Sequence, residues 1–179
     1  MKKFLQLCAI FLTLLFGIVS ATPAQSGGQI TEISLARTAC FGRCPVYEVI
    51  LRADGTATYI GRRFAPRTGT YKGKISSRDF NKLARLLIAR DFFNFEDHYA
   101  VHATDLPSAN TSALRGGMRK RVEDYGPGFE ESMGRNGQPA GRAHAPTGLL
   151  EIERAIDAVA VRIKWVKVSD NVDHHRTND

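Results

Sequence analysis

Hydrophobic and polar residues alternate in four segments of the first half of the chain, which predicts four β-strands. In the first segment, for example, Ile33 and Leu35 fall on one side and Ser34 on the other. Asp54-Gly55 separates the second segment from the third and predicts a hairpin turn, because glycine tolerates the positive φ angles that such turns need. The four predicted strands span residues 29–38, 46–52, 56–61 and 68–73.

A change to a repeat of three and four residues predicts a helix over residues 77–90. Ser76 stands where its side chain can accept hydrogen bonds from free backbone amides, and Asp79 follows three residues later, as in a shortened capping box. Four apolar residues then recur at positions i, i+3, i+4 and i+7: Phe80, Leu83, Ala84 and Leu87. This stripe predicts that one side of the helix is buried.

The second half of the chain repeats the pattern of a hairpin followed by a helix. Residues 109–114 and 119–125 lie on either side of Gly116-Gly117, which predicts two antiparallel strands and their turn. A segment rich in glycine and proline then predicts a flexible insert over residues 126–146. Pro146-Thr147 opens the last predicted helix, whose apolar stripe consists of Leu149, Ile152, Ile156, Val159 and Ile163.

This order of elements predicts an α+β fold with two layers. Four strands, a helix, two strands and a helix need no parallel crossover, so the simplest arrangement is an antiparallel sheet of about six strands with both helices packed on one face. The length of 179 residues and the hydrophobic share of 43% suit one domain with its own core. We place this domain at residues 29–168 and expect the polar residues 169–179 to form a disordered tail.

The N-terminus has the organisation of a secretory signal peptide. Two lysines precede an almost unbroken apolar run over residues 4–19, and small residues follow it. Residues 1–21 therefore form the predicted signal peptide, with cleavage after Ala21 or after Ala24. The alternative is an uncleaved N-terminal helix that anchors the chain in a membrane. We expect an exported protein that is periplasmic or extracellular.

Loss of the signal peptide changes the meaning of the charge and cysteine counts. The formal charge of +7 falls to +5 when Lys2 and Lys3 are removed, and export separates the protein from intracellular nucleic acid. The basic balance then indicates an anionic envelope component or another envelope protein as the partner. Cys8 is lost with the signal peptide, so Cys40 and Cys44 form an even pair in an oxidising compartment, which predicts a disulfide.

A second interpretation of the cysteine pair is thiol chemistry. A reactive cysteine needs a helix N-terminus or a nearby cation to stabilise its thiolate, commonly in C-x-x-C spacing. Here three residues separate Cys40 from Cys44, and Pro45 and a predicted strand follow. A structural disulfide is the better interpretation. The alternative is an enzyme or a thiol-dependent redox factor that uses this loop together with Arg43 and Tyr47.

The cysteine pair lies in the sequence CFGRCPVY, residues 40–47. With this motif the chain resembles a bacterial family of exported domains of unknown function that carry C-F-G-x-C-P-x-Y. Further residues match that family pattern in the same order: Asp54-Gly55, Tyr59, Gly61, Gly69, Tyr99, Thr104-Asp105-Leu106-Pro107, Ile156-Asp157 and Trp165. The long glycine- and proline-rich segment after Tyr125 departs from the pattern. The resemblance implies an exported domain and brings no activity with it.

Positive charge gathers beside the predicted hairpins, which is typical of a solvated face that keeps a domain soluble and, alternatively, of a surface that binds an anionic partner. Our first hypothesis is a noncatalytic exported binding module. One cluster lies after the third predicted strand, and a second follows the Gly116-Gly117 turn, with Arg119, Lys120 and Arg121. The sheet face opposite the helices and these basic hairpins are the expected place of binding. The candidate binding surface consists of Arg43, Tyr47, Arg62, Arg63, Arg67 and Asp105.

A metal site is a weaker hypothesis. His98 and His102 lie four residues apart, a spacing that could share a metal on a helix, but the residues that follow are typical of a turn and no third ligand is assured. The sequence contains no nucleophile elbow and no phosphate-binding loop. We therefore expect no metal site, no cofactor and no catalytic residues.

Overall fold

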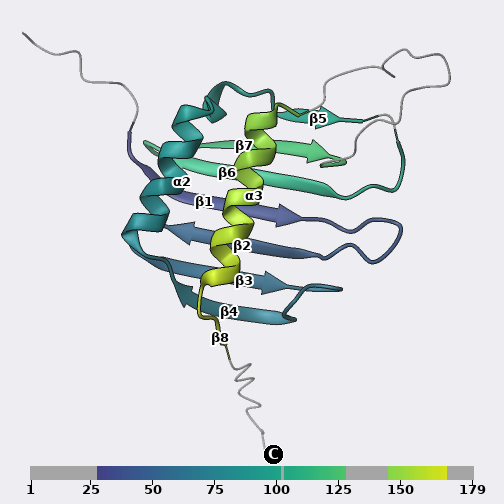
Figure 1. The fold of residues 1–179 in the computed structure, drawn as a ribbon, viewed down its shortest axis with the longest axis horizontal. Helices are drawn as coiled ribbons and strands as arrows, with labels where there is room; N and C mark the ends of the chain where they lie inside the picture. The colour runs from purple at the N-terminus through teal and green to yellow at the C-terminus, as the bar shows by residue number, and fades with distance from the viewer. Residues whose placement is uncertain (1–27, 102, 128–144, 169–179) are drawn as a thin grey trace, which may run out of the picture.

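The computed structural model of the chain describes residues 28–101, 103–127 and 145–168. Outside these ranges lie the predicted signal peptide with both of its cleavage positions, most of the predicted insert, His102 and the predicted tail. The described residues form one eight-stranded sheet, and both helices lie over the same face of it (Figure 1). The fold is therefore α+β with two layers.

Two hairpin groups and two long helices appear where the alternation and the helical repeats predict them. A single turn of 3-10 helix follows the first long helix and contributes Phe92 to the core. The elements in chain order are β1 (Ile30–Arg37), β2 (Tyr47–Arg52), β3 (Thr56–Gly61), β4 (Gly69–Lys74), α2 (Ser77–Ala89), η1 (Phe92–Asn94), β5 (His98–Ala100), β6 (Ser108–Arg115), β7 (Met118–Tyr125), α3 (Thr147–Arg162) and β8 (Val166–Lys167).

The prediction of about six strands is wrong, because two short strands extend the sheet at its edges. The sheet has the order β5-β7-β6-β1-β2-β3-β4-β8. The edge strand β8 pairs antiparallel with β4, whereas the other edge strand, β5, pairs parallel with β7. The sheet is therefore mostly, not entirely, antiparallel. Strands of two and three residues are too short to show an alternating pattern, and pairing with a longer neighbour defines them.

Glycines form the two tight turns that the sequence predicts. Gly55 has a φ angle of +86°, and Gly116 and Gly117 have φ angles of +56° and +82°, a region that residues with a Cβ atom rarely adopt. In the first turn the Asp54 carboxylate accepts hydrogen bonds from the hydroxyl and the backbone amide of Thr56, at 2.7 and 2.8 Å. These hydrogen bonds hold the pKa of Asp54 below its usual value.

Both long helices bury the stripes that their sequences predict. The Ser76 hydroxyl accepts a hydrogen bond from the Asp79 amide at 3.1 Å, which confirms the predicted start of α2. The core lies between the helices and the sheet, and its side chains without solvent exposure include Ile33, Leu35, Val49, Leu51, Leu87, Leu149, Ile152 and Ile156. None of the described helices is long and apolar enough to cross a membrane.

The register between β1 and β2 determines which side chains lie beneath α3. Leu35 pairs with Val49, and two residues further along Arg37 pairs with Tyr47. Because successive side chains alternate between the faces of a sheet, Arg37 and Tyr47 share the helix-covered face with the buried core. They lie at the end of the sheet where β1 passes into the cysteine loop.

Candidate functional site

The cysteine loop connects β1 to β2 at one end of the sheet. The sulfurs of Cys40 and Cys44 lie at disulfide-bonding distance, and their Cα atoms are 5.7 Å apart. No helix begins at either cysteine among the described residues, so the helix dipole that would stabilise a thiolate is missing from the elements around the pair. This arrangement favours the structural interpretation of the pair.

Backbone hydrogen bonds join the cysteine loop to two other connections at the same end of the sheet (Figure 1). The Phe41 amide donates to the carbonyl oxygen of Asp105 at 2.9 Å. On the other side, the Val46 amide donates to the carbonyl of Arg63 at 2.9 Å, and the Arg62 amide donates to the carbonyl of Val46 at 2.8 Å. The loop is thus fixed at both of its flanks.

Two aromatic rings and a guanidinium group stand out from this framework. The Phe41 side chain is 90% exposed, and Phe64 is 49% exposed with a φ angle of +57°. The guanidinium carbon of Arg43 lies 5.4 Å from the centre of the Phe64 ring, within the range of a cation–π contact. Left-handed backbone is uncommon for a phenylalanine and costs free energy, so the surrounding loop must hold Phe64 in place.

Three more arginines, Arg62, Arg63 and Arg67, are exposed on the connection between β3 and β4. Among the described residues, neither these three nor Arg43 forms an ion pair. The second basic hairpin differs, because Arg119 binds Glu32 at 2.8 Å. We use the name loop-end patch for the exposed group Phe41, Arg43, Arg62, Arg63, Phe64 and Arg67.

A small cavity of about 230 Å³ adjoins the loop-end patch. Ala36, Glu48 and Ile60 are cross-strand neighbours on the sheet face opposite the helices, and they line the cavity together with Val46 and Arg62. This volume is below the range of pockets that enclose drug-sized ligands. The cavity is large enough for one side chain of a partner.

The ring of Tyr47 points away from the rest of the predicted binding surface, although Tyr47 lines the same small cavity as Arg62. Its ring stacks on Tyr59 with the ring centres 5.6 Å apart, on the helix-covered face. Its hydroxyl donates to a carboxylate oxygen of Asp157 at 2.6 Å. Burial is the larger cause, and this hydrogen bond the smaller cause, of the raised pKa of Tyr47. Asp105 does lie beside the cysteine loop, but its backbone carbonyl makes the contact, and its φ angle of +64° fits the predicted turn.

Asp157 also binds Arg37 and so ties α3 to the first two strands. The guanidinium of Arg37 donates to Asp157 at 2.8 and 3.2 Å. A second carboxylate of α3, Glu153, has an oxygen 3.7 Å from the same guanidinium, and its side chain is 2% exposed. We use the name polar cluster for Arg37, Tyr47, Glu153 and Asp157.

Burial raises the pKa of Glu153 to about 8. The positive charge of Arg37 opposes this shift, whereas the negative charges of Asp124 and Asp157 add to it. One carboxyl oxygen of Glu153 has no hydrogen-bond partner among the described residues. Both facts indicate that Glu153 is protonated in the folded domain at neutral pH.

The predicted histidine pair does not come together as a site in the described part of the chain. His98 lies 3.4 Å from Glu123 on the edge of the sheet, and His102 lies outside the described residues. Within the described ranges, no group of three potential metal ligands is close enough to hold an ion.

Residues 31–159 match the family model of a domain of unknown function, DUF6438. The chain belongs to this family. The match begins in β1 and ends inside α3, so the DUF6438 region includes the cysteine loop, the loop-end patch and the polar cluster. No curated protein matches the chain.

The polar cluster of this DUF6438 domain was not predicted, although the sequence contains a signal for it. Glu153 and Asp157 are one helical turn apart and adjoin Ile152 and Ile156 of the apolar stripe. A carboxylate on that side of a helix faces the core and needs a cation or a donor there. Arg37 is the matching signal, since it follows Ile33 and Leu35 in the alternation of β1.

Proposed function

We propose that the domain is a noncatalytic binding module of the bacterial cell envelope, which binds an acidic surface of another envelope protein through the loop-end patch. The observation that carries this proposal is the exposure of Phe41. A large apolar side chain that is 90% exposed is held on a short loop whose flanks are hydrogen-bonded to neighbouring connections. Because these hydrogen bonds already fix the backbone of the loop, little backbone freedom is lost when a partner covers Phe41.

The composition of the patch favours a protein partner. Aromatic residues and arginine are enriched in the energetically important centres of protein–protein interfaces. The four arginines without an ion-pair partner among the described residues favour a partner of opposite charge and speed its association. An anionic polymer or a lipid phosphate would be attracted by the arginines alone and would not need Phe41. The experiment below distinguishes such a ligand from a protein partner.

The compartment is part of the proposal. It is supported by the lysines, the apolar run and the small residues of segment 1–24 and by the cysteine pair at disulfide-bonding distance. Mass spectrometry of the N-terminus of protein from an envelope fraction should find a chain that begins at Thr22 or Gln25. Recovery of the protein only in the cytoplasm, with Met1 retained, would contradict export.

Photo-crosslinking tests the binding surface directly. We would place a benzophenone amino acid at Phe41 and, in a matched control, at Met118, which is 79% exposed in the turn at the other end of the sheet. Position 41 should give a discrete protein adduct in intact envelopes, and position 118 should not. The adduct should fade at high salt and in Arg62→Glu/Arg63→Glu, because both changes weaken attraction to an acidic surface. Equal adducts at both positions, or binding to anionic vesicles without any protein adduct, would refute the proposal.

A further inference from the structure

The outer surface of the helix layer contains a groove between α2 and α3. Its first part is a hollow of about 490 Å³ whose apolar surface includes Leu86, Ala155 and Val159. The groove continues past Asp79 and Arg162, which line both parts, into a second hollow of about 650 Å³. We use the name helix groove for these two hollows together.

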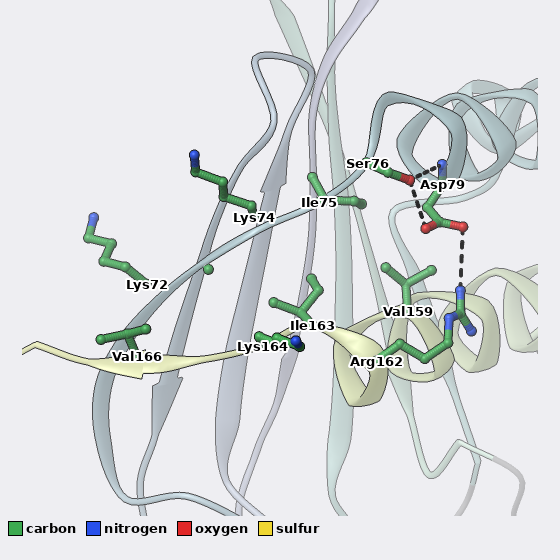
Figure 2. A pocket seen from close by; sticks show the side chains of 11 residues that line it. Lys72, Lys74, Ile75, Ser76, Asp79, Val159, Arg162, Ile163, Lys164 and Val166 are labelled. Atoms are coloured by element: carbon green, nitrogen blue, oxygen red, sulfur yellow. Dashed lines mark hydrogen bonds and ion pairs between the residues drawn. The ribbon is translucent and has the colours of Figure 1, made fainter.

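Figure 2 shows the second hollow, where α3 ends beside the β4–α2 connection. Ile75 and Ile163 approach each other across it, and Val159 lies on the side of α3. Arg162 extends from α3 to Asp79 at the start of α2, at 3.6 Å. The floor of the hollow is therefore apolar, and its polar groups lie at the margin.

The helix groove has an excess of positive charge. Both acidic side chains that line it are already paired, Asp79 with Arg162 and Glu151 with Arg90 at 2.7 Å. Three exposed cations of the lining, namely Lys82, Arg85 and Lys164, form no ion pair with a described residue.

Two further lysines stand at the outer margin. In Figure 2 the ammonium groups of Lys72 and Lys74 point away from the apolar floor, because these lysines alternate with Gly73, which faces Ile163. They leave the hollow open. The groove therefore combines an apolar floor with a positive margin.

The shape of the groove favours a helical peptide over a small ligand. An apolar small molecule is normally enclosed over most of its surface, whereas residues on both sides of this groove, such as Lys82 and Ala158, are exposed to solvent. An amphipathic helix can place its apolar side on the floor and leave its polar side in water. The 13 residues of α2 extend over about 20 Å, so a partner helix of about four turns would match the groove.

We propose that the helix groove binds an acidic amphipathic helix of a partner protein. The partner's apolar residues at i, i+3, i+4 and i+7 lie on the floor between α2 and α3, and its carboxylates lie beside Lys82, Arg85 and Lys164. The bound helix becomes a third member of the helix layer. This surface is separate from the loop-end patch, so either proposal can fail without the other.

A designed peptide provides the probe. It is a fluorescein-labelled 15-residue helix with leucine and alanine along one side and glutamate on the other, and its control has the same composition in scrambled order. Fluorescence anisotropy with the full-length protein should show at least about tenfold tighter binding of the amphipathic peptide than of the scrambled one. Equal binding of the two peptides would overturn the proposal, because it would reflect net charge alone.

Three variants locate the site, one within the groove and two outside it. Lys82→Glu/Arg85→Glu should weaken peptide binding at least about tenfold, since both side chains are exposed on the margin of the groove and their reversal leaves the core intact. Arg154→Glu, an exposed position of α3 outside the lining residues, is the control and should bind as the parent protein does. The loop-end variant Arg62→Glu/Arg63→Glu should also retain peptide binding.

Other outcomes contradict the proposal in specific ways. In NMR spectra, addition of the peptide should change the amide chemical shifts of α2 and α3. Changes confined to the loop-end patch would show that the peptide binds that other surface. Binding to vesicles of anionic phospholipid, without binding of the peptide, would make the groove a lipid site. Retained affinity in Lys82→Glu/Arg85→Glu would exclude the groove.

Discussion

The polar cluster and the loop-end patch lie at the same end of the sheet, and both contain arginine and aromatic side chains. They differ in whether the arginine forms an ion pair within the chain. In the polar cluster the guanidinium of Arg37 binds Asp157 and the Tyr47 hydroxyl binds the same carboxylate. In the loop-end patch no arginine has an ion-pair partner among the described residues. Similar residue types therefore hold the fold together in one place and remain exposed to solvent in the other.

Burial explains the difference. A charged group covered by a helix must find its counter-charge within the chain, because leaving it without one costs several kcal/mol. An exposed arginine is solvated by water and gains little from a local ion pair. We therefore expect substitutions in the polar cluster to change the free energy of unfolding, and substitutions of arginines in the loop-end patch to change binding.

The largest expected effect is the pH dependence that Glu153 imposes on stability. Its folded-state pKa of about 8 exceeds the ordinary value of 4.5, so the folded state retains this proton over a range in which the unfolded state has lost it. The contribution is fully present below pH 4.5 and is lost as the pH rises through 8, with a slope of at most about 1.4 kcal/mol per pH unit. Urea denaturation at a series of pH values should show this fall.

The substitution Glu153→Gln removes the ionisable group and keeps its shape, and it should flatten that part of the profile. Glu151→Gln is the matched control, because Glu151 is on the same helix and its ion pair with Arg90 is about half exposed. The control should keep the slope of the parent protein. A Glu153→Gln profile as steep as that of the parent would show that another group causes the pH dependence.

The next largest effect is expected for Asp157→Ala, which removes the carboxylate that accepts hydrogen bonds from both the Arg37 guanidinium and the Tyr47 hydroxyl. We expect a loss of about 2–3 kcal/mol in the free energy of unfolding. Asp97→Ala removes a carboxylate that binds Lys120 at 2.6 Å but is 84% exposed, and it should cost less than about 1 kcal/mol. A similar loss in the two variants, measured by urea denaturation, would show that α3 does not depend on the polar cluster.

Most of the fold could be predicted because its long elements repeat over many residues. The alternation around Ile33, the cap at Ser76 and the Gly116-Gly117 turn each act locally, and the structure confirms all three. The edge strands β5 and β8 could not be predicted, because their backbone partners in β7 and β4 are distant in the sequence. Pairing of this kind depends on tertiary structure and leaves little trace in a short segment.

The candidate site could be predicted only in part, for a similar reason. The sequence identified Arg43, Arg62, Arg63 and Arg67, whose exposure follows from their charge, and the connections of the sheet bring them to one end. Tyr47, the last residue of the cysteine motif, was expected in the same surface. The strand alternation turns that ring toward α3, where Asp157 binds it. A contact across 110 residues could be found only from the fold.

Apart from the control variants, the smallest expected loss of stability is that of the cysteine pair, which links the two regions. Closure of a loop of about five residues contributes roughly 2 kcal/mol, so Cys40→Ser/Cys44→Ser should lower the free energy of unfolding by about that amount. Because the loop holds Phe41, the variant should also lose the adduct formed at position 41 while its far-UV circular dichroism stays unchanged. Addition of a reducing agent should not change the free energy of unfolding of this variant any further. Unchanged stability together with loss of a catalytic activity would instead favour the thiol-dependent alternative. An unchanged adduct would show that the backbone hydrogen bonds to Asp105 and Arg63 are enough to hold Phe41 in place.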